Sequence, residues 1–461
     1  MEIIVFQKKR MMNKGDKVMF IPPNFIVYDK EGEEMYTQFK TGIHYTAKDV
    51  HTLCIKLEEV EGMFLKEHFR VVEFPYEFIC KDCGEDFASK DPKSNCAQCS
   101  SPNVKIMDKT KIKAEIVADS LSPQGDRLTS LLVTFPRIIL AEVNTHRMLS
   151  KNTSSSRAIP FKKMVESVQN DPFIPIAWQK HHSGMQGIEY FTDEKDIYRV
   201  EQVWGDARRR AIDVAKDLHS SKVTKQLCNR LLEPFMWTTM LITGSKEGWD
   251  NFFNLRAGNY GFTIDGNYHQ FKSKKELLGS RFGYLYKDNM DLQWLQINKD
   301  QEEIHMMALA ESIYDAMSES TPEQLAGGMW HIPFMSSIDS SKLQSTKGKD
   351  VSMEMVKIST AMAAHTSYTI VGGEAVKSYE KCIELHDKLV ASDPPHSSPM
   401  EHCARAMSNE EYVSFIKGNL DAEIDTDGYI DISTHINNHN SFGWCRNFKG
   451  FIPYRHIIET K

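Results

Sequence analysis

Four of the nine cysteines fall into one closely spaced pattern, Cys80-x-x-Cys83, twelve further residues and then Cys96-x-x-Cys99. Two such pairs place four thiolates where one tetrahedral zinc ion can collect them, and a closed site of this kind stabilises a fold without leaving a position for substrate. Two disulfides are the alternative, but the basic residues at the N-terminus follow a very short apolar run, the reverse of a signal peptide. We therefore predict a structural zinc ribbon over residues 77–104.

The region ahead of the cysteines has a different pattern. Short apolar runs separated by Pro-Pro, Gly and acidic turns fill residues 15–75 and predict a small, SH3-like all-β barrel over residues 1–76. The barrel is an accessory module, and its composition is not notably basic. Binding of nucleic acid or of a partner protein by these N-terminal modules is therefore left open.

Length and charge limit the classes of protein that remain. A chain of 461 residues exceeds one hydrophobic core, and a formal charge of −7 excludes a generally basic nucleic-acid binder. The most apolar stretch, residues 131–143, is interrupted by charged residues and is too short to span a bilayer. We expect a cytoplasmic protein with no membrane partner.

The residues after 105 change character and predict a separate, larger body over residues 105–461. Pro136 is expected to begin a helix that carries Glu142, His146 and Leu149 along one face. The polar run LSKNTSSSRAIP follows, and its serines and Arg157 can cradle an anion such as phosphate. An ordinary helix end with a Ser-rich loop is the alternative, which composition alone favours.

Residues 145–157, THRMLSKNTSSSR, resemble the signature of flavin-dependent thymidylate synthases. That signature is Arg-His-Arg, two residues, Ser, any, Asn, Glu, any, Ser, any, Arg. The matching residues are His146, Arg147, Ser150, Asn152, Ser155 and Arg157. The sequence departs at Thr145, where the family has Arg, at Thr153, where it has Glu, and at Glu142, where it has Gln.

Two later blocks resemble the same family. Residues 228–256 resemble its second conserved region, matching at Arg230, Asn251, Leu255 and Arg256 but departing at Ser245 and Glu247. Gln301, Glu303 and Ile304 match a Gln-x-Glu-Ile element. Between these blocks lies an insertion, about residues 257–298, for which a lid, a partner surface and an inert loop are all open readings.

The order of the blocks indicates a rearranged chain. Residues 363–368 and 396–407 resemble elements that precede the His-Arg motif in the family, yet here they follow it. The resemblance therefore implies a circularly permuted unit with its permuted elements at about 357–407, a change that proteins tolerate when the original termini lie close together. Residues 398–401 also predict a capping box with Ser398 at the N-cap and Glu401 at N3.

The resemblance implies an α+β fold and a homotetramer with flavin between the subunits. It also implies transfer of a one-carbon unit from methylene-tetrahydrofolate to C5 of dUMP, with FAD that NADPH reduces. Arg256 is assigned to catalysis, where it faces the pyrimidine and favours the ionised form at N3. The expected substrate-binding residues are Glu142, Thr145, Thr153, Ser154, Ser155, Ser156, Arg157, Arg230 and Arg256. The expected flavin-binding residues are His146, Arg147, Met148, Asn152, Asn251, His396, Ser398 and Glu401.

The departures leave alternatives open. Thr145 removes a positive charge and Glu247 reverses one. We therefore expect either a shifted cofactor pose or compensation by another base, Lys151 or Lys246. The acceptor can then be a related pyrimidine nucleotide such as dCMP, and the product can carry hydroxymethyl in place of methyl. A hypothesis of another class is a non-catalytic nucleic-acid- or protein-binding factor with a degenerate synthase-like domain. The retained substrate arginines favour the enzyme.

Overall fold

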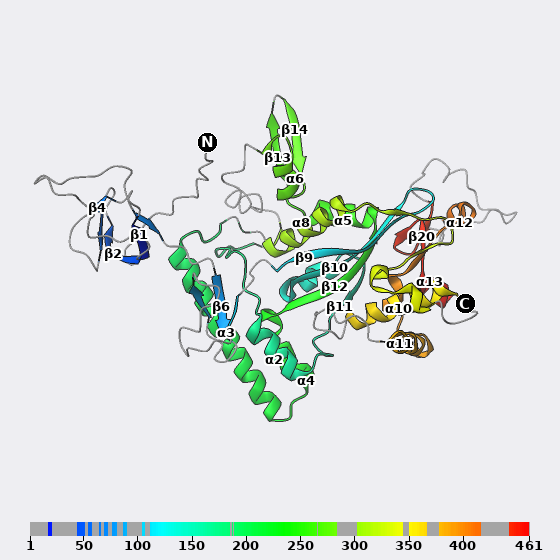
Figure 1. Cartoon of the computed structure of the whole chain (residues 1–461), viewed down its shortest axis with the longest axis horizontal. Helices are drawn as coiled ribbons and strands as arrows, with labels where there is room; N and C mark the ends of the chain where they lie inside the picture. Colours follow the sequence, from blue (N-terminus) through cyan, green and yellow to red (C-terminus); the bar gives the residue numbers. More distant parts are fainter. Residues whose placement is uncertain are drawn as a thin grey trace, which may run out of the picture. The chain divides into compact units, whose positions relative to one another are not determined.

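The computed structural model (Figure 1) describes residues 111–460 apart from 185–186, 188, 265, 284–301, 344–349, 367–377 and 416–441, and before residue 111 it describes only the backbone of short strands. The chain divides into two compact units, Met1–Met107 and Asp108–Lys461. Each unit is described by itself below.

The first unit contains two small antiparallel sheets. One sheet has the strand order β4-β3-β2-β1-β5 and the other has the order β7-β6-β8. Their bounds are Lys17–Phe20 for β1, His44–Val50 for β2, Cys54–Leu57 for β3, Phe64–Leu65 for β4, Phe69–Val71 for β5, Tyr76–Cys80 for β6, Asp86–Ser89 for β7 and Val104–Ile106 for β8. Closure of the first sheet into a barrel stays a prediction. So does the zinc ribbon, because Cys83, Cys96, Cys99 and the side chain of Cys80 lie outside the described residues.

A five-stranded sheet organises the second unit (Figure 1). Its order is β11 (Ser150–Thr153), β12 (Trp237–Ser245), β10 (Arg127–Pro136), β9 (Lys113–Leu121) and β15 (Glu323–Gln324). Neighbouring strands are antiparallel except for β15, which runs parallel to β9. Gly125, at a φ of 86°, lies in the turn between β9 and β10, where its lack of a Cβ avoids strain. This short β11 forms one edge of the sheet.

The two faces of this sheet differ in chemistry because strand residues alternate between them. One face presents Leu131, Val133, Met240 and Ile242 to helices α5 (Lys246–Arg256) and α8 (Ile304–Glu319), and the contact forms an extensive apolar core. The other face carries hydroxyl groups, among them Ser130 and Thr243, whose Oγ atoms are 2.6 Å apart. Helix α10 (Val351–Thr366) packs against the β11–β12 edge.

Smaller elements complete the unit. A second core lies among α2 (Phe161–Asn170), α3 (Glu194–Ser220) and the residues in and around η3. Helix α4 (Lys225–Arg230) packs against α2 and α3. The insertion forms a hairpin of β13 and β14 followed by α6. The remaining bounds are Arg137–Ile139 for η2, Leu140–Asn144 for α1, Glu233–Phe235 for η3, Tyr260–Ile264 for β13, Asn267–Phe271 for β14, Lys274–Gly279 for α6, Trp330–His331 for β16, Met335–Ser337 for η5, Ser340–Leu343 for α9, Tyr379–Ala391 for α11, Ser398–Glu401 for η6, Ala404–Ala406 for β17, Asn409–Ser414 for α12, Trp444–Cys445 for β18, Phe448–Lys449 for β19, Phe451–Pro453 for β20 and Tyr454–Glu459 for α13.

The mixed α+β class is confirmed, but one helix prediction is wrong. The helix that starts near Pro136 ends at Asn144, so His146 and Leu149 lie beyond it. Pairing with β12 draws residues 150–153 into a strand, and this tertiary contact outweighs the helical pattern. None of the helices in the described ranges has the length and apolarity that crossing a membrane requires.

Candidate functional site

Arg256, the last residue of α5, is the centre of a network with three partners from two other segments. Its Nε–H donates to Nε2 of His146 at 2.9 Å, and one terminal nitrogen forms an ion pair with Glu302. The other terminal nitrogen lies 3.4 Å from Oγ1 of Thr145. The guanidinium is therefore oriented from three sides by groups of its own chain, which fixes the direction of its charge.

His146 is a neutral acceptor in this network. Its side chain is buried, and the ring meets Phe252 edge-on with the centroids 4.8 Å apart. Burial, together with the charges of Arg256 and Lys151, lowers the pKa of His146 to about 4. Since Nε2 accepts the hydrogen bond from Arg256, the ring proton belongs on Nδ1.

Lys151 is a second cation close to His146. It lies on β11, and its Nζ donates to the backbone carbonyl of His146. Burial lowers the pKa of this lysine to about 8, and the carboxylate of Glu401 opposes the shift. Two positively charged groups thus lie near one neutral imidazole.

The Ser-rich turn follows the opposite end of β11 and is held by its backbone. The amide of Asn229, which is fully buried on α4, donates to the carbonyl oxygens of Ser156 at 2.7 Å and Ile159 at 2.9 Å. The two arginines expected to bind substrate at this turn, Arg157 and Arg230, are exposed, and Nε of Arg157 is 3.2 Å from Oε1 of Gln226. The chain therefore orders the turn while its two guanidinium groups stay at the surface.

Two segments from late in the chain meet the same strand. The side-chain amide of Asn152 on β11 donates to the backbone carbonyl of Ala363 in α10. The 3₁₀ helix η6, which contains Ser398 and Glu401, also packs against β11. Segments separated by more than two hundred positions in the sequence are therefore neighbours at this edge of the sheet.

The capping box predicted for η6 is wrong. Ser397, not Ser398, is at the N-cap and makes no side-chain capping bond. The carboxylate of Glu401 instead forms an ion pair with Arg455 of α13. An ion pair with a cation from a distant helix therefore replaces the local bond to a backbone N–H.

The expected flavin residues divide into a buried and an exposed group. His146 and Asn152 are buried, and Met148 and Glu401 are partly exposed. The exposed members are Arg147, Asn251, His396 and Ser398. Among the expected substrate residues, Ser154 and Ser156 are buried, while Ser155 and Thr153 are partly exposed.

Lys449 is the cation that pairs with Glu247, a role that the sequence led us to expect from Lys151 or Lys246. The Lys449 ammonium is 3.3 Å from Glu247 and 3.4 Å from Asp126, and only 8% of the residue is exposed. Lys246 pairs with Asp250 on its own helix instead. Sequence reasoning also missed Glu302, because it occupies the unspecified position of the Gln-x-Glu-Ile element.

Glu142 has a carboxylate oxygen available for a ligand. Its Oε2 is buried and has no hydrogen-bond partner among the described residues. A buried acceptor without a donor is costly, so a hydroxyl or N–H group supplied by a ligand would stabilise it. This observation is consistent with the substrate-binding role expected for Glu142.

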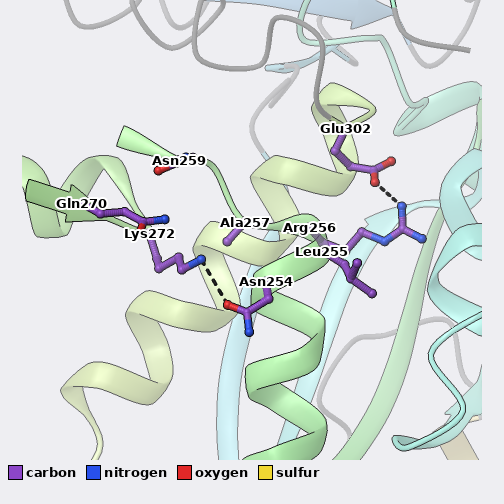
Figure 2. Close-up of a pocket in the computed structure, with 8 residues that line it drawn as sticks. All are labelled: Asn254, Leu255, Arg256, Ala257, Asn259, Gln270, Lys272 and Glu302. Atoms are coloured by element: carbon purple, nitrogen blue, oxygen red, sulfur yellow. Dashed lines mark hydrogen bonds and ion pairs between the residues drawn. The ribbon is translucent and has the colours of Figure 1, made fainter. Parts of the chain in front are cut away.

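A polar cleft opens beside Arg256 (Figure 2). Its volume is about 400 Å³, and its walls come from the end of α5, the inserted hairpin and Glu302. The lining residues are Asn254, Leu255, Arg256, Ala257, Asn259, Gln270, Lys272 and Glu302. Within the described ranges, no group of three or more His, Cys, Asp or Glu side chains is arranged to hold a metal ion.

Comparison with known proteins gives little further information. No family model and no curated protein matches the chain. Among solved structures, the chain is similar to the crystal structure of a UMP/dUMP methylase, PolB from Streptomyces cacaoi, bound with 5-Br UMP. The identity is 16% and the TM-score is 0.28, and the match covers 46% of this chain and 96% of that one. The same protein bound with 5-Br dUMP matches at 13% identity and a TM-score of 0.28, over 45% and 96%. A TM-score this low assigns neither fold nor function.

Proposed function

We propose that this chain is a circularly permuted, flavin-dependent thymidylate synthase. It transfers a one-carbon unit from methylene-tetrahydrofolate to C5 of dUMP, giving dTMP, with FAD that NADPH reduces. The observation that carries the proposal is the meeting, around β11, of the three segments that resemble this family. Arg256 bonds to His146, and Asn152 bonds to Ala363, so the segments around residues 145–157, 228–256 and 357–407 contact one another despite their changed order.

The chemistry of the exposed residues fits FAD. A flavin dinucleotide carries an anionic diphosphate and ring carbonyl and nitrogen acceptors, which require cationic and neutral hydrogen-bond donors. Arg147 supplies a guanidinium, Asn251 an amide, His396 an imidazole and Ser398 a hydroxyl, all exposed. Bound and reduced, the flavin supplies the hydride that completes the methyl group.

Arg256 has the catalytic role in this proposal. A fixed guanidinium beside the pyrimidine stabilises negative charge that develops at N3, and most of this benefit comes from orientation before the reaction starts. His146 provides that orientation, because it accepts from Nε and stays neutral in the physiological range. The unpaired Oε2 of Glu142 accepts a hydrogen bond from a hydroxyl or N–H group of the nucleoside.

Arg157 and Arg230 hold the phosphate of the nucleotide. They lie beyond the end of β11 opposite to His146, and a strand of four residues spans roughly 13 Å. Among the described residues, the side-chain partners of Arg256 are His146, Glu302 and Thr145, and none of them is a partner of Arg157. A homotetramer, in which neighbouring subunits complete each site, accommodates this separation and follows the family resemblance.

We also propose a structural zinc ion on Cys80, Cys83, Cys96 and Cys99 and a cytoplasmic location. The cysteine spacing supports the zinc ion. Measurement of one zinc ion per chain, lost when all four cysteines are replaced by serine, would support it. A full-length protein that folds without zinc would contradict it.

The reaction is tested with methylene-tetrahydrofolate labelled in its one-carbon unit. Purified protein, FAD, NADPH and either dUMP or dCMP are incubated, and mass spectrometry identifies the labelled nucleotide. We expect labelled dTMP that requires both FAD and dUMP. Transfer to dCMP, or a hydroxymethyl product, would show that the protein catalyses that related reaction and not methylation of dUMP. Absence of labelled product, flavin binding and nucleotide binding would favour the non-catalytic alternative.

A further inference from the structure

The insertion is a folded wall fixed to the catalytic body. The Tyr260 hydroxyl donates to the carboxylate of Glu311 in α8, and both groups are buried. Oγ of Ser273 donates to Asp315, also in α8, at 2.5 Å. Leu277 of α6 is buried against Tyr260 in a small apolar cluster. The hairpin is therefore held in position by α8, and an inert loop does not describe it.

This wall faces the end of α5 across the polar cleft (Figure 2). The insertion supplies Asn259, Gln270 and Lys272, and Arg256 and Glu302 lie on the other side of the Ala257 turn. The volume of about 400 Å³ lies within the range of small-molecule sites. Three amide side chains, two cations and one carboxylate make the lining polar, with a formal charge of +1.

The cations of the cleft differ in their partners. Glu302, the one carboxylate of the lining, forms its ion pair with Arg256. The Nζ of Lys272 donates to the neutral amide oxygen of Asn254 at 3.3 Å. The positive charge that the cleft offers to a ligand is therefore that of Lys272. The ion pair between Glu302 and Arg256 is the same kind of contact that an oxyanion of a ligand would make with this guanidinium.

We propose that this cleft is an oxyanion subsite of the enzyme, in which Lys272 contacts an anionic group of a substrate and Glu302 competes with that group for Arg256. The inference rests on the proposed function. Two substrates carry a suitable oxyanion. The proposed function assigns the phosphate of the pyrimidine nucleotide to Arg157 and Arg230, so the expected group is a glutamate carboxylate of the folate. Binding of the phosphate here would transfer that assignment to Lys272. The insertion then adds a binding residue that the family resemblance does not supply.

Two substitutions test the subsite because they have opposite effects. Loss of a charge-assisted contact in K272M weakens binding about tenfold. E302Q removes the competing carboxylate and tightens binding severalfold. The matched control is K275M, which lies on the same insertion but forms only an exposed ion pair with Glu319 and leaves affinity unchanged. Urea unfolding of each variant separates loss of binding from loss of folding.

Calorimetric titrations identify the oxyanion. dUMP is compared with deoxyuridine, and tetrahydrofolate monoglutamate with the polyglutamate and with a pteroate that lacks glutamate. If K272M weakens dUMP but not deoxyuridine, the phosphate is the ligand group, and if it weakens only the glutamylated folates, their carboxylates are. Unchanged affinity of K272M and E302Q for all of these ligands overturns the subsite.

Flavin binding, measured on the same samples, separates this inference from the proposed function. If wild-type protein binds FAD and substrates but the variants behave alike, the subsite is wrong and the enzyme stands. If the protein binds no flavin and yet Lys272 governs anion binding, the subsite stands and the proposed reaction fails. Absence of any binding by wild-type protein contradicts both.

Discussion

The two ends of β11 hold their arginines in different ways. At one end, Arg256 is engaged by His146, Glu302 and Thr145 before any ligand is present. At the other end, buried Asn229 orders the backbone of the Ser-rich turn, while the guanidinium groups of Arg157 and Arg230 are exposed. The chain thus fixes the guanidinium itself at one end, whereas at the other end it fixes only the backbone near the exposed arginines.

This difference indicates that the arginines at the two ends act on different steps, Arg256 on turnover and the exposed arginines on binding. A cation held in place before the reaction stabilises the transition state without reorganisation, so changes to it alter turnover. An exposed arginine loses side-chain freedom when a ligand binds, so changes to it alter affinity. The following predictions test whether the two ends behave in these separate ways.

The largest effect is expected at Arg256. We predict that R256A lowers kcat about 100- to 1,000-fold, because the oriented donor to the pyrimidine is lost. R256K keeps the charge but not the planar fork, and its kcat remains at least tenfold below wild type. Single-turnover kinetics measure the effect, with K246A on the same helix as the control. An unchanged kcat with a raised KM would make Arg256 equivalent to the exposed arginines and remove the contrast.

A smaller effect is expected at the first turn of α5, where Lys449 holds two carboxylates. K449M leaves Glu247 and Asp126 without their shared cation, so the free energy of unfolding falls by about 2–3 kcal/mol. The matched variant K246M breaks an exposed pair and changes it by less than about 0.5 kcal/mol. Urea denaturation compares the two. Equal values would show that Lys449 does not compensate the charge reversal.

His146 predicts a pH dependence of stability. Its pKa is about 4 in the folded protein and about 6.5 unfolded, so the unfolded chain binds one more proton between these values. Stability therefore falls as the pH is lowered from about 6.5 to about 4, and His146 contributes about 1.4 kcal/mol per pH unit to the slope. Urea unfolding at several pH values should give a slope shallower by that amount in H146Q. Equal slopes would place His146 outside the Arg256 network.

The smallest effect on the protein itself is expected at Arg157. R157A should weaken dUMP binding about tenfold while the free energy of unfolding changes by less than about 0.5 kcal/mol. Deoxyuridine, which lacks the phosphate, should bind wild type and R157A equally. R199A, an exposed arginine on α3, is the control. Equal loss of dUMP and deoxyuridine binding would mean that Arg157 does not contact the phosphate.

The elements that local patterns determine were predictable, and those that depend on distant partners were not. The helical turn that starts after Pro136 follows from the local sequence, because proline suits the start of a helix. The end of α1 at Asn144 does not, because pairing of residues 150–153 with β12 decides it. The partner of Glu247 was also hidden, since Lys449 lies about two hundred positions away. A family motif can place Arg256 at a site, but it does not indicate that the unspecified residue Glu302 binds it.

Flavin binding tests the central claim most directly. Purified full-length protein is titrated with FAD while its visible absorption is recorded, then reduced with NADPH and mixed with dUMP. We predict a yellow complex with an oxidised-flavin spectrum that NADPH bleaches, and a further spectral change with dUMP that R256A lacks. A protein that binds neither FAD nor dUMP would contradict the proposed enzyme.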